Sequence, residues 1–234
     1  MKGKLFIIEA GDGSGKATQA EKLTSRLTAE GFRAMKVSFP NYQSQSSALI
    51  RMYLKGEFGS SPEDVNPYVA STFYAVDRYA SFRQEWEAFY RGGGIVVADR
   101  YTTSNMVHQA AKIPCAAERD RFLHWLWDLE FEKFQLPVPD AVIFLHMPPQ
   151  VAFDLLLKRD NATTGREARD IHEEHREFLK ASYENACRLA SAYGWLTVEC
   201  CRQGELRPVQ DIHGEIYSLV RKLIEPGEDE HALS

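Results

Sequence analysis

Residues 5–19 read LFIIEAGDGSGKATQ, and this segment indicates the fold most clearly. The apolar run at 5–8 predicts a buried strand, and the segment from Lys16 onward predicts a helix. Between them, Gly11, Gly13 and Gly15 allow a tight turn in which successive backbone N–H groups converge on phosphate oxygens. The helix directs its positive N-terminal end at the same anion. Since Lys16 can reach the outer phosphates of a nucleoside triphosphate, the stretch predicts a phosphate-binding loop.

Two positions of this loop depart from the full P-loop pattern, which requires Gly at position 10 and Ser or Thr at position 17. The chain has Ala10 and Ala17 there, so a glycine-rich helix cap is the alternative interpretation. Ala10 fits only if its backbone avoids the conformations reserved for glycine. Ala17 lacks the hydroxyl that commonly binds Mg²⁺, which predicts a weaker metal affinity unless Thr18 or Asp99 compensates.

Length and composition favour one compact domain of a cytoplasmic protein. The 234 residues include 28 basic and 33 acidic side chains, and this balance argues against a nucleic-acid polymer as partner. The four cysteines form no CxxC pair, which is typical of reduced thiols in the cytoplasm. The apolar run near the first residues is too short for the hydrophobic region of a signal sequence. No apolar segment reaches membrane-spanning length.

Short apolar runs alternate with helical patterns along the chain. This alternation predicts a three-layer α/β/α P-loop fold with a five-stranded parallel sheet. The expected strands are 5–8, 34–39, 95–98, 141–146 and 195–199. The expected helices are 16–30, 45–55, 66–91, 103–111, 118–134, 149–159, 171–193 and 208–224. Such sheets bind ligands at the carboxyl ends of their strands, where Asp12, Pro40 and Asp99 would lie.

Residues 1–225 are expected to form this single domain, and residues 226–234 a flexible tail. The polar stretch at 160–170 carries Arg166 and Arg169 and lies between two helical patterns. It therefore resembles a flexible lid.

A second group of polar residues follows the apolar run at 95–98. In P-loop enzymes, an acid at the end of such a strand helps to hold Mg²⁺, and Asp99 is the candidate here. The neighbouring Arg100 could bind a phosphate through two parallel hydrogen bonds. The alternative for Asp99 is a cap on the next helix.

Tyr74 and Arg78 lie four residues apart in a helical pattern and therefore on one face. An aromatic ring beside a guanidinium suits a nucleobase, because the ring stacks and the guanidinium donates hydrogen bonds. Ordinary packing plus a surface charge is the alternative.

Taken together, these segments resemble the thymidylate kinases from about Lys4 to Ile224. The similarity is carried by Glu9–Gln19, Phe39-Pro40, Phe73–Arg78 and Asp99-Arg100-Tyr101 with Ser104. The resemblance implies a P-loop nucleoside monophosphate kinase that transfers the γ-phosphoryl group of ATP to dTMP. The products would be dTDP and ADP, the cofactor Mg²⁺, and the assembly a homodimer, as is common in that family.

The resemblance also assigns residues to sites. It places around ATP Gly11, Asp12, Gly13, Ser14, Gly15, Lys16, Ala17, Thr18 and Arg159. It places around dTMP Asp12, Phe39, Tyr42, Tyr74, Arg78, Arg100, Asn105, His108 and Gln109. Asp12 would lie near the sugar 3′-hydroxyl, Arg78 and Asn105 at the thymine edge, and Arg100 at the acceptor phosphate. The implied catalytic residues are Lys16, Asp99, Arg100 and Arg166, with Asp99 at the metal.

The phosphate loop has no arginine, so the chain looks like the type of thymidylate kinase that supplies its catalytic arginine from the lid. Arg166 is the first choice over Arg169. Asn41 stands where many relatives carry an arginine beside the acceptor phosphate. His108 stands where the family commonly has the tyrosine that crowds the sugar 2′ position, so discrimination against ribonucleotides is in question. Tyr74 replaces the usual Phe, a conservative difference.

Two other functions remain open at this point: a kinase for another deoxynucleotide or a deoxynucleoside, and a nucleotide-binding protein that has lost turnover. The segment from His172 to His175 invites a zinc interpretation, but its histidines are three apart where the metalloprotease motif needs four. A solvated helix face is expected there. The aromatic residues between Phe122 and Phe134 predict core packing or a dimer face.

Overall fold

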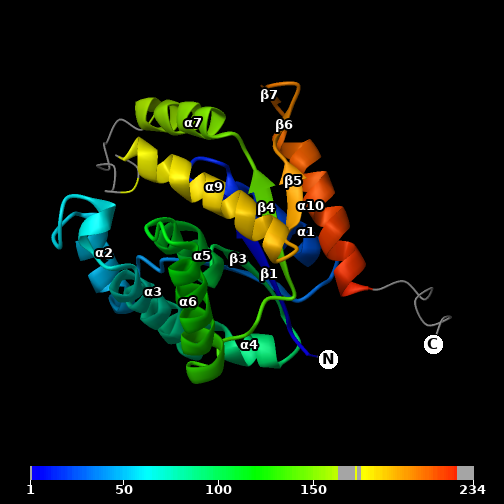
Figure 1. Ribbon diagram of the computed structural model, residues 1–234. Coiled ribbons are helices and arrows are strands. Elements are labelled where there is room, and N and C mark those ends of the chain that lie inside the picture. The colour runs from blue at the N-terminus through cyan, green and yellow to red at the C-terminus, as the bar shows by residue number, and fades with distance from the viewer. Residues whose placement is uncertain (1, 163–171, 173–174, 226–234) are drawn as a thin grey trace.

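The computed structural model describes residues 2–162, 172 and 175–225, with only the backbone described for 157–162. Its centre is a five-stranded, all-parallel sheet in the order β2-β3-β1-β4-β5 (Figure 1). The strands are β1 (Lys4–Glu9), β2 (Ala34–Ser38), β3 (Ile95–Asp99), β4 (Ala141–His146) and β5 (Leu196–Glu199). Each predicted strand is present, and the predicted α/β class is confirmed.

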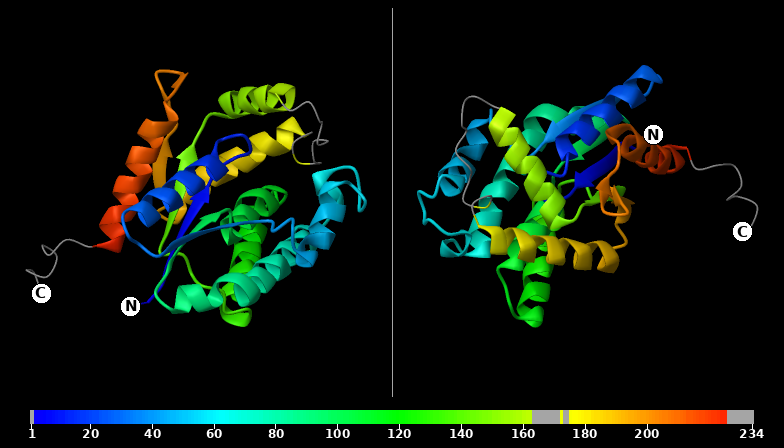
Figure 2. Two further views of the ribbon diagram at one scale, coloured as in Figure 1. Left: turned by 180° about the vertical axis from the view of Figure 1, so that it is seen from behind. Right: turned by 90° about the horizontal axis from the view of Figure 1, so that it is seen from above.

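Helices cover both faces of the sheet. One face is packed by α1 (Lys16–Ala29) and α10 (Val209–Ile224), which lie side by side in the view from behind (Figure 2). Alternation along β1 directs Phe6 and Ile8 to this face and Leu5 and Ile7 to the other. All four are fully buried, as expected for a strand enclosed on both sides.

The opposite layer holds the helices of the middle of the chain and the one before β5. Its members are α3 (Pro67–Ser81), α4 (Glu87–Arg91), α5 (Thr102–Ala111), α6 (Ala116–Trp127) and α9 (Arg176–Ala192). Phe122 is buried in this layer and Trp125 packs against the same cluster, so core packing is confirmed there. Two further helices, α2 (Ala48–Leu54) and α7 (Pro149–Ala162), lie near the carboxyl edge of the sheet.

Several predicted helices are subdivided. The expected helix 66–91 contains a π-helical turn, Phe82–Trp86, between α3 and α4, and the expected helix 118–134 ends in another, Asp128–Lys133. The expected helix 45–55 opens with a 3₁₀ turn, Gln45–Ser47. The expected helix 171–193 begins later, because α9 starts at Arg176.

A small hairpin was missed. Strands β6 (Cys201–Arg202) and β7 (Glu205–Leu206) pair antiparallel after β5. Gln203 and Gly204 both have positive φ, at 53° and 84°, which suits a two-residue hairpin turn.

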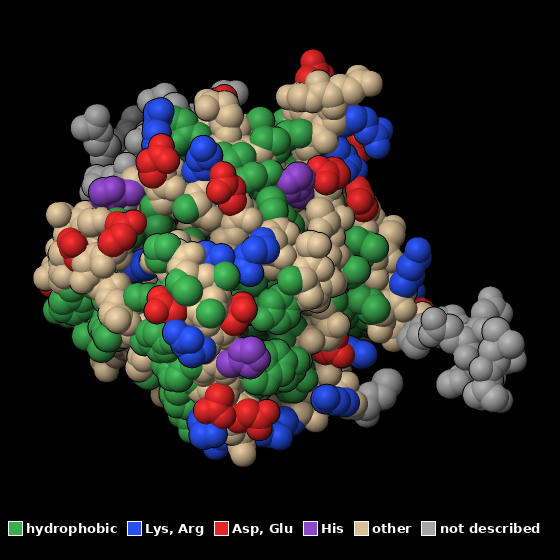
Figure 3. All heavy atoms as spheres, in the orientation of Figure 1, with side chains coloured by type: hydrophobic (Ala, Val, Ile, Leu, Met, Phe, Trp, Pro, Cys, Tyr) green, Lys and Arg blue, Asp and Glu red, His purple; other side chains and the backbone are tan. Residues whose placement is uncertain are grey.

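Of the predicted lid, residues 160–162 belong to the end of α7, and 163–170 lie outside the described residues, as does the tail 226–234. No described helix is long and apolar enough to cross a membrane. Basic and acidic side chains are interspersed over the face shown in Figure 3. All four cysteines are free thiols.

Candidate active site

The phosphate loop connects β1 to α1 at the centre of the sheet. Gly13 and Gly15 have φ of 78° and 79°, in the left-handed region that favours glycine. Lys16 begins α1, and its Nζ donates a hydrogen bond to the carbonyl of Gly11 at 2.7 Å. Ala10 is buried and is not among the described non-glycine residues with positive φ, so it fits the loop without backbone strain.

Helix α7 presses directly on this loop. A Cβ at position 13 would lie 2.5 Å from the carbonyl oxygen of Ala152 and 2.7 Å from Cγ of Leu156. Position 13 therefore needs glycine both for its φ and for the close approach of the helix. No larger side chain, including an arginine, fits there without moving α7.

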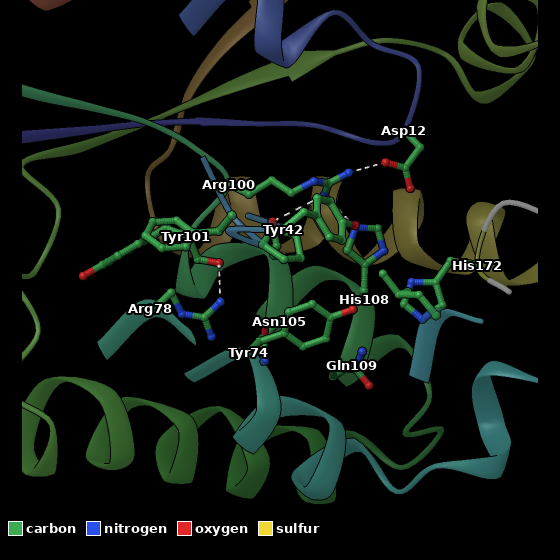
Figure 4. Close-up of a pocket in the computed structure, with 14 residues that line it drawn as sticks. Asp12, Tyr42, Tyr74, Arg78, Arg100, Tyr101, Asn105, His108, Gln109 and His172 are labelled. Carbon is green, nitrogen blue, oxygen red and sulfur yellow. Dashed lines mark hydrogen bonds and ion pairs between the residues drawn. The ribbon is translucent and has the colours of Figure 1, made fainter. Parts of the chain in front are cut away.

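Asp12 and Arg100 form the ion pair that joins the loop to the end of β3 (Figure 4). Lys16 Nζ lies 3.9 Å from the same carboxylate. Burial would raise the pKa of Asp12, but Arg100 and Lys16 together hold that pKa well below its usual range. Burial and the nearby Arg100 lower the pKa of Lys16 to about 8.

Arg100 adopts a left-handed backbone conformation, with φ of 68°, which is costly for a residue with a side chain. Its Nη1 lies 3.4 Å from Ser104 Oγ and 3.2 Å from His108 Nε2. Glu9, fully buried at the end of β1, lies 3.9 Å from the same guanidinium group. The Glu9 carboxylate accepts hydrogen bonds from the hydroxyls of Thr103 and Ser104, which fixes the start of α5. Sequence inspection did not assign Glu9 a role.

A cavity of about 150 Å³ opens beside this ion pair. It is lined by Pro40, Leu54, Tyr101, Ser104 and His172 and by the nine residues that the resemblance assigned to the acceptor: Asp12, Phe39, Tyr42, Tyr74, Arg78, Arg100, Asn105, His108 and Gln109. The structure thus brings all nine into one cavity (Figure 4). Their contact with an acceptor stays a prediction.

Arg78 is 1% exposed, so the alternative of a surface charge is wrong. Its Nε and Nη2 donate to the two carboxylate oxygens of Glu130 at 2.7 and 2.6 Å, a bidentate pair. Thr102 Oγ1 also donates to this carboxylate at 2.7 Å. Glu130 lies in the π-helical turn after α6 and was missed, because nothing local to the sequence distinguishes it from a surface acid.

His172 was predicted to lie on a solvated helix face, and this is wrong. It is 6% exposed, precedes α9, and lines the cavity next to His108. Their rings stack at 6.0 Å between centroids. No metal-binding cluster of three or more His, Cys, Asp or Glu side chains occurs among the described residues, which leave out 173 and 174.

Asp99 is a suitable magnesium ligand. Its Oδ1 is buried and has no hydrogen-bond partner within the described part of the chain. A buried carboxylate oxygen next to a phosphate loop fits a hard divalent cation. Ala17 and Thr18 are both exposed in the first turn of α1.

The remaining predicted residues are less informative. Asn41 lies outside the lining of the cavity, and its Nδ2 donates to Glu85 at 2.7 Å. Arg159 lies in the last part of α7, 157–162, where only the backbone is described, and Arg166 lies outside the described residues.

A glycine-rich phosphate loop beside an arginine-lined cavity, at the carboxyl edge of a parallel sheet, is the arrangement of a P-loop phosphotransferase. A family model described as thymidylate kinase matches residues 8–204. The chain belongs to the thymidylate kinase family, as the resemblance predicted, and it is a phosphotransferase.

Curated relatives agree with this assignment. The chain is 32% identical over 192 residues to a thymidylate kinase of Mycobacterium tuberculosis, covering 82% of this chain and 87% of the relative. It is 26% identical to a thymidylate kinase of Schizosaccharomyces pombe, covering 94% and 92%. It is 27% identical to a thymidylate kinase of Plasmodium falciparum, covering 97% and 94%.

Proposed function

We propose that this protein transfers the γ-phosphoryl group of ATP to dTMP, giving dTDP and ADP. The observation that carries the proposal is the Asp12–Arg100 ion pair, which joins the phosphate loop to the arginine-lined cavity. The phosphate loop and the Arg100 guanidinium would each bind a phosphate beside this pair, as head-to-head binding of a donor and an acceptor nucleotide requires. The family membership supports the same reaction and does not favour another deoxynucleotide, a deoxynucleoside or a binding protein without turnover.

Phosphoryl transfer asks a protein mainly for alignment and positive charge. The amides of the phosphate loop and Lys16 would hold the phosphates of ATP. Arg100 would hold the phosphate of dTMP, one oxygen of which attacks the γ-phosphorus. The bond from that phosphorus to the β–γ bridging oxygen breaks, and ADP leaves with the electron pair.

The base of dTMP would lie between Tyr74 and Arg78. The Arg78 side chain is already fixed by Glu130 and Tyr101, whose carbonyl lies 3.4 Å from Nη1. A guanidinium held in this way loses little conformational entropy when the base binds.

The proposed cofactor is Mg²⁺. Asp99 would be its protein ligand, and the ion would neutralise phosphate charge. Arg166 is the proposed catalytic arginine of the lid, and Arg159 is proposed to contact ATP. The close packing at position 13 supports a catalytic arginine from outside the phosphate loop, because α7 leaves no room for a side chain there.

Residues 1–225 would form one domain with a lid at about 160–170 and a flexible tail at 226–234.

A homodimer is also part of the proposal. Val69 and Val76 lie seven residues apart on one side of α3 and are 47% and 45% exposed. Exposed apolar side chains of this kind are expected on a face that a second copy of the chain covers. The free thiols support a cytoplasmic location.

The test is ADP formation with ATP and Mg²⁺ when dTMP, dUMP, dCMP, dGMP and thymidine are offered separately. The proposal predicts the highest kcat/KM with dTMP. ATP binding without ADP release in the presence of dTMP would contradict it, and a clear preference for another acceptor would change the substrate.

A further inference from the structure

One wall of the acceptor cavity is a loop, residues 39–47, the acceptor loop. It joins β2 to α2, and apart from a 3₁₀ turn at its end it has no regular structure. Three of its residues line the cavity together with Tyr74 and Arg78 of α3: Phe39, Pro40 and Tyr42 (Figure 4). Because an irregular loop lacks the hydrogen-bond ladder of a helix or sheet, neighbouring groups must fix the position of this wall.

Asp77, on α3, holds the acceptor loop by its carboxylate. Its Oδ2 accepts a hydrogen bond from the backbone N–H of Asn41 at 2.8 Å, and its Oδ1 accepts one from the hydroxyl of Ser46 at 2.6 Å. Asp77 is 1% exposed. Burial raises the pKa of Asp77, and the two hydrogen bonds oppose this shift, so both bonds stabilise the ionised carboxylate. Movement of the loop would leave this buried carboxylate without either donor, which favours the observed position of the loop.

The side chain of Asn41 is attached next to this point. Its Nδ2 donates to Glu85 Oε1 at 2.7 Å, in the π-helical turn after α3. The hydroxyl of Ser81 donates to the other oxygen of Glu85, also at 2.7 Å. An ionised carboxylate only accepts, so the amide of Asn41 must present its nitrogen to Glu85. Asn41 is thus bound at its backbone by Asp77 and at its side chain by Glu85.

Helix α2 holds the middle of the acceptor loop. Arg51 Nη1 donates to the backbone carbonyls of Tyr42 and Ser44, at 3.0 and 3.1 Å. It also donates to the hydroxyl oxygen of Ser47 at 2.6 Å. The acceptor loop is therefore attached to α2 on one side and to α3 and the turn after it on the other.

We propose that Asn41, Asp77 and Glu85 are positioning residues of the acceptor site, which hold the acceptor loop against α3 before the acceptor binds. Since α3 also carries Tyr74 and Arg78, this attachment fixes two walls of the cavity relative to each other. A wall that is already in place needs less ordering when a ligand binds, so affinity is gained without a contact to the ligand. The inference rests on the proposed function for the identity of the acceptor, whereas the attachment of the loop does not depend on it.

Asn41 and Glu85 allow the donor and the acceptor of one hydrogen bond to be exchanged. Asn41→Asp places a carboxylate against Glu85 and breaks the bond. In the double variant Asn41→Asp/Glu85→Gln the bond is restored in the opposite direction, because the introduced amide donates to the introduced carboxylate. The oxygen of that amide can still accept from Ser81. If Asn41 instead contacted the acceptor phosphate, the second substitution could not repair the first.

The first readout needs no ligand. Hydrogen–deuterium exchange, measured by mass spectrometry, gives the protection of peptides that cover the acceptor loop. Since loss of a hydrogen bond changes an equilibrium about 2- to 12-fold, protection should fall by that factor in Asn41→Asp and at least as much in Asp77→Ala. The double variant should return to the wild-type value. Peptides from α10 should not change, which excludes a general loss of stability.

The second readout is kinetic. KM for dTMP should rise about 2- to 12-fold in Asn41→Asp and Asp77→Ala, with kcat and KM for ATP within about twofold of wild type. The double variant should again resemble the wild type. Glu87→Ala is the matched control, because it removes an acid of α4 that pairs with Arg83 and Arg91 outside the cavity. It should change neither readout.

Unchanged protection of the acceptor loop in both Asp77→Ala and Asn41→Asp would overturn the proposal, and so would a KM for dTMP equal to that of Glu87→Ala. A double variant as impaired as Asn41→Asp would overturn the role of Glu85. Asn41 is only half-buried, so Asn41→Asp still decides the question if Asp77→Ala fails to fold.

The proposed function can fail separately. If the wild-type protein phosphorylated no acceptor while the protection of the acceptor loop still fell in the variants, the proposed function would be wrong and the attachment of the loop would stand.

Discussion

At the scale of single residues, Arg78 is held by a carboxylate with no exposed surface. Glu130→Gln keeps the size of the side chain but leaves the Arg78 charge buried without its counter-ion. Removing one partner of a buried pair costs about 3–5 kcal/mol, and we expect a loss of that order in the free energy of unfolding, measured with urea. Asp128→Asn breaks the exposed pair with Lys133, which solvent screens, and should cost far less than Glu130→Gln. Equal losses in the two variants would contradict this account of Glu130.

Because His108 is buried, we expect the free energy of unfolding to depend on pH. Its pKa is lowered to about 3 from an ordinary 6.5, so between these values the unfolded chain binds a proton that the folded chain does not. Stability must therefore rise with pH across this window, and lowering the pH from 7 to 5 should cost on the order of 2 kcal/mol from this group. His108→Gln should lack that part of the loss. His124→Gln, at an exposed site, should retain it.

If His108→Gln and the wild type lost the same stability between pH 7 and pH 5, the buried neutral imidazole would be ruled out as a source of this dependence.

Arg166 carries the prediction for catalysis. An arginine that stabilises the transferring phosphoryl group contributes about 10³–10⁵ in rate in related systems. We expect Arg166→Ala to lower kcat by a factor of that order while the affinity for dTMP changes little, as measured by steady-state kinetics and calorimetry. Arg169→Ala is the matched control and should have the smaller effect. Unchanged turnover in Arg166→Ala would eliminate this role.

At the scale of elements, α7 and the phosphate loop are packed so closely that one methyl group should separate them. Gly13→Ala places a Cβ against Ala152 and Leu156 and also adopts an unfavourable φ. Gly31→Ala has a similar positive φ and open space around it, so it isolates the backbone cost of about 1–2 kcal/mol. We expect Gly13→Ala to lose more stability than Gly31→Ala and to weaken ATP binding, measured by calorimetry. Equal stability and unchanged ATP affinity would contradict the close packing.

The elements also show what the sequence can and cannot predict. The phosphate loop with its flanking strand and helix was predicted, and so were the acid that ends β3 and the arginine after it, because the chemistry of each is local to a contiguous segment. Glu130 meets Arg78 across 52 residues, and His172 meets Tyr53 across 119. Such contacts depend on how helices pack. The π-helical turn also changes the side of the helix on which Glu130 lies, so no periodicity in the sequence reveals these contacts.

At the scale of the whole molecule, one side of α3 lines the cavity and the other side is exposed to solvent. Tyr74 and Arg78 line the cavity, whereas Val69 and Val76 are exposed. If a second copy covers the outer face, Val76→Glu should shift the protein from dimer to monomer in sedimentation-velocity ultracentrifugation. Val209→Glu, an equally exposed valine at the start of α10, is the control and should leave the mass unchanged. A wild-type protein that sediments as a monomer would contradict the proposed homodimer.

Two nucleotides are proposed to meet head to head beside Asp12 and Arg100. A crystal structure with one molecule that joins adenosine and thymidine through a chain of phosphates would show whether they do. We expect the thymine between Tyr74 and Arg78, and the phosphates running past Arg100 onto the amides of the loop at Gly11–Lys16. A thymidine half bound outside this cavity, or phosphates that bypass the loop, would contradict this proposal.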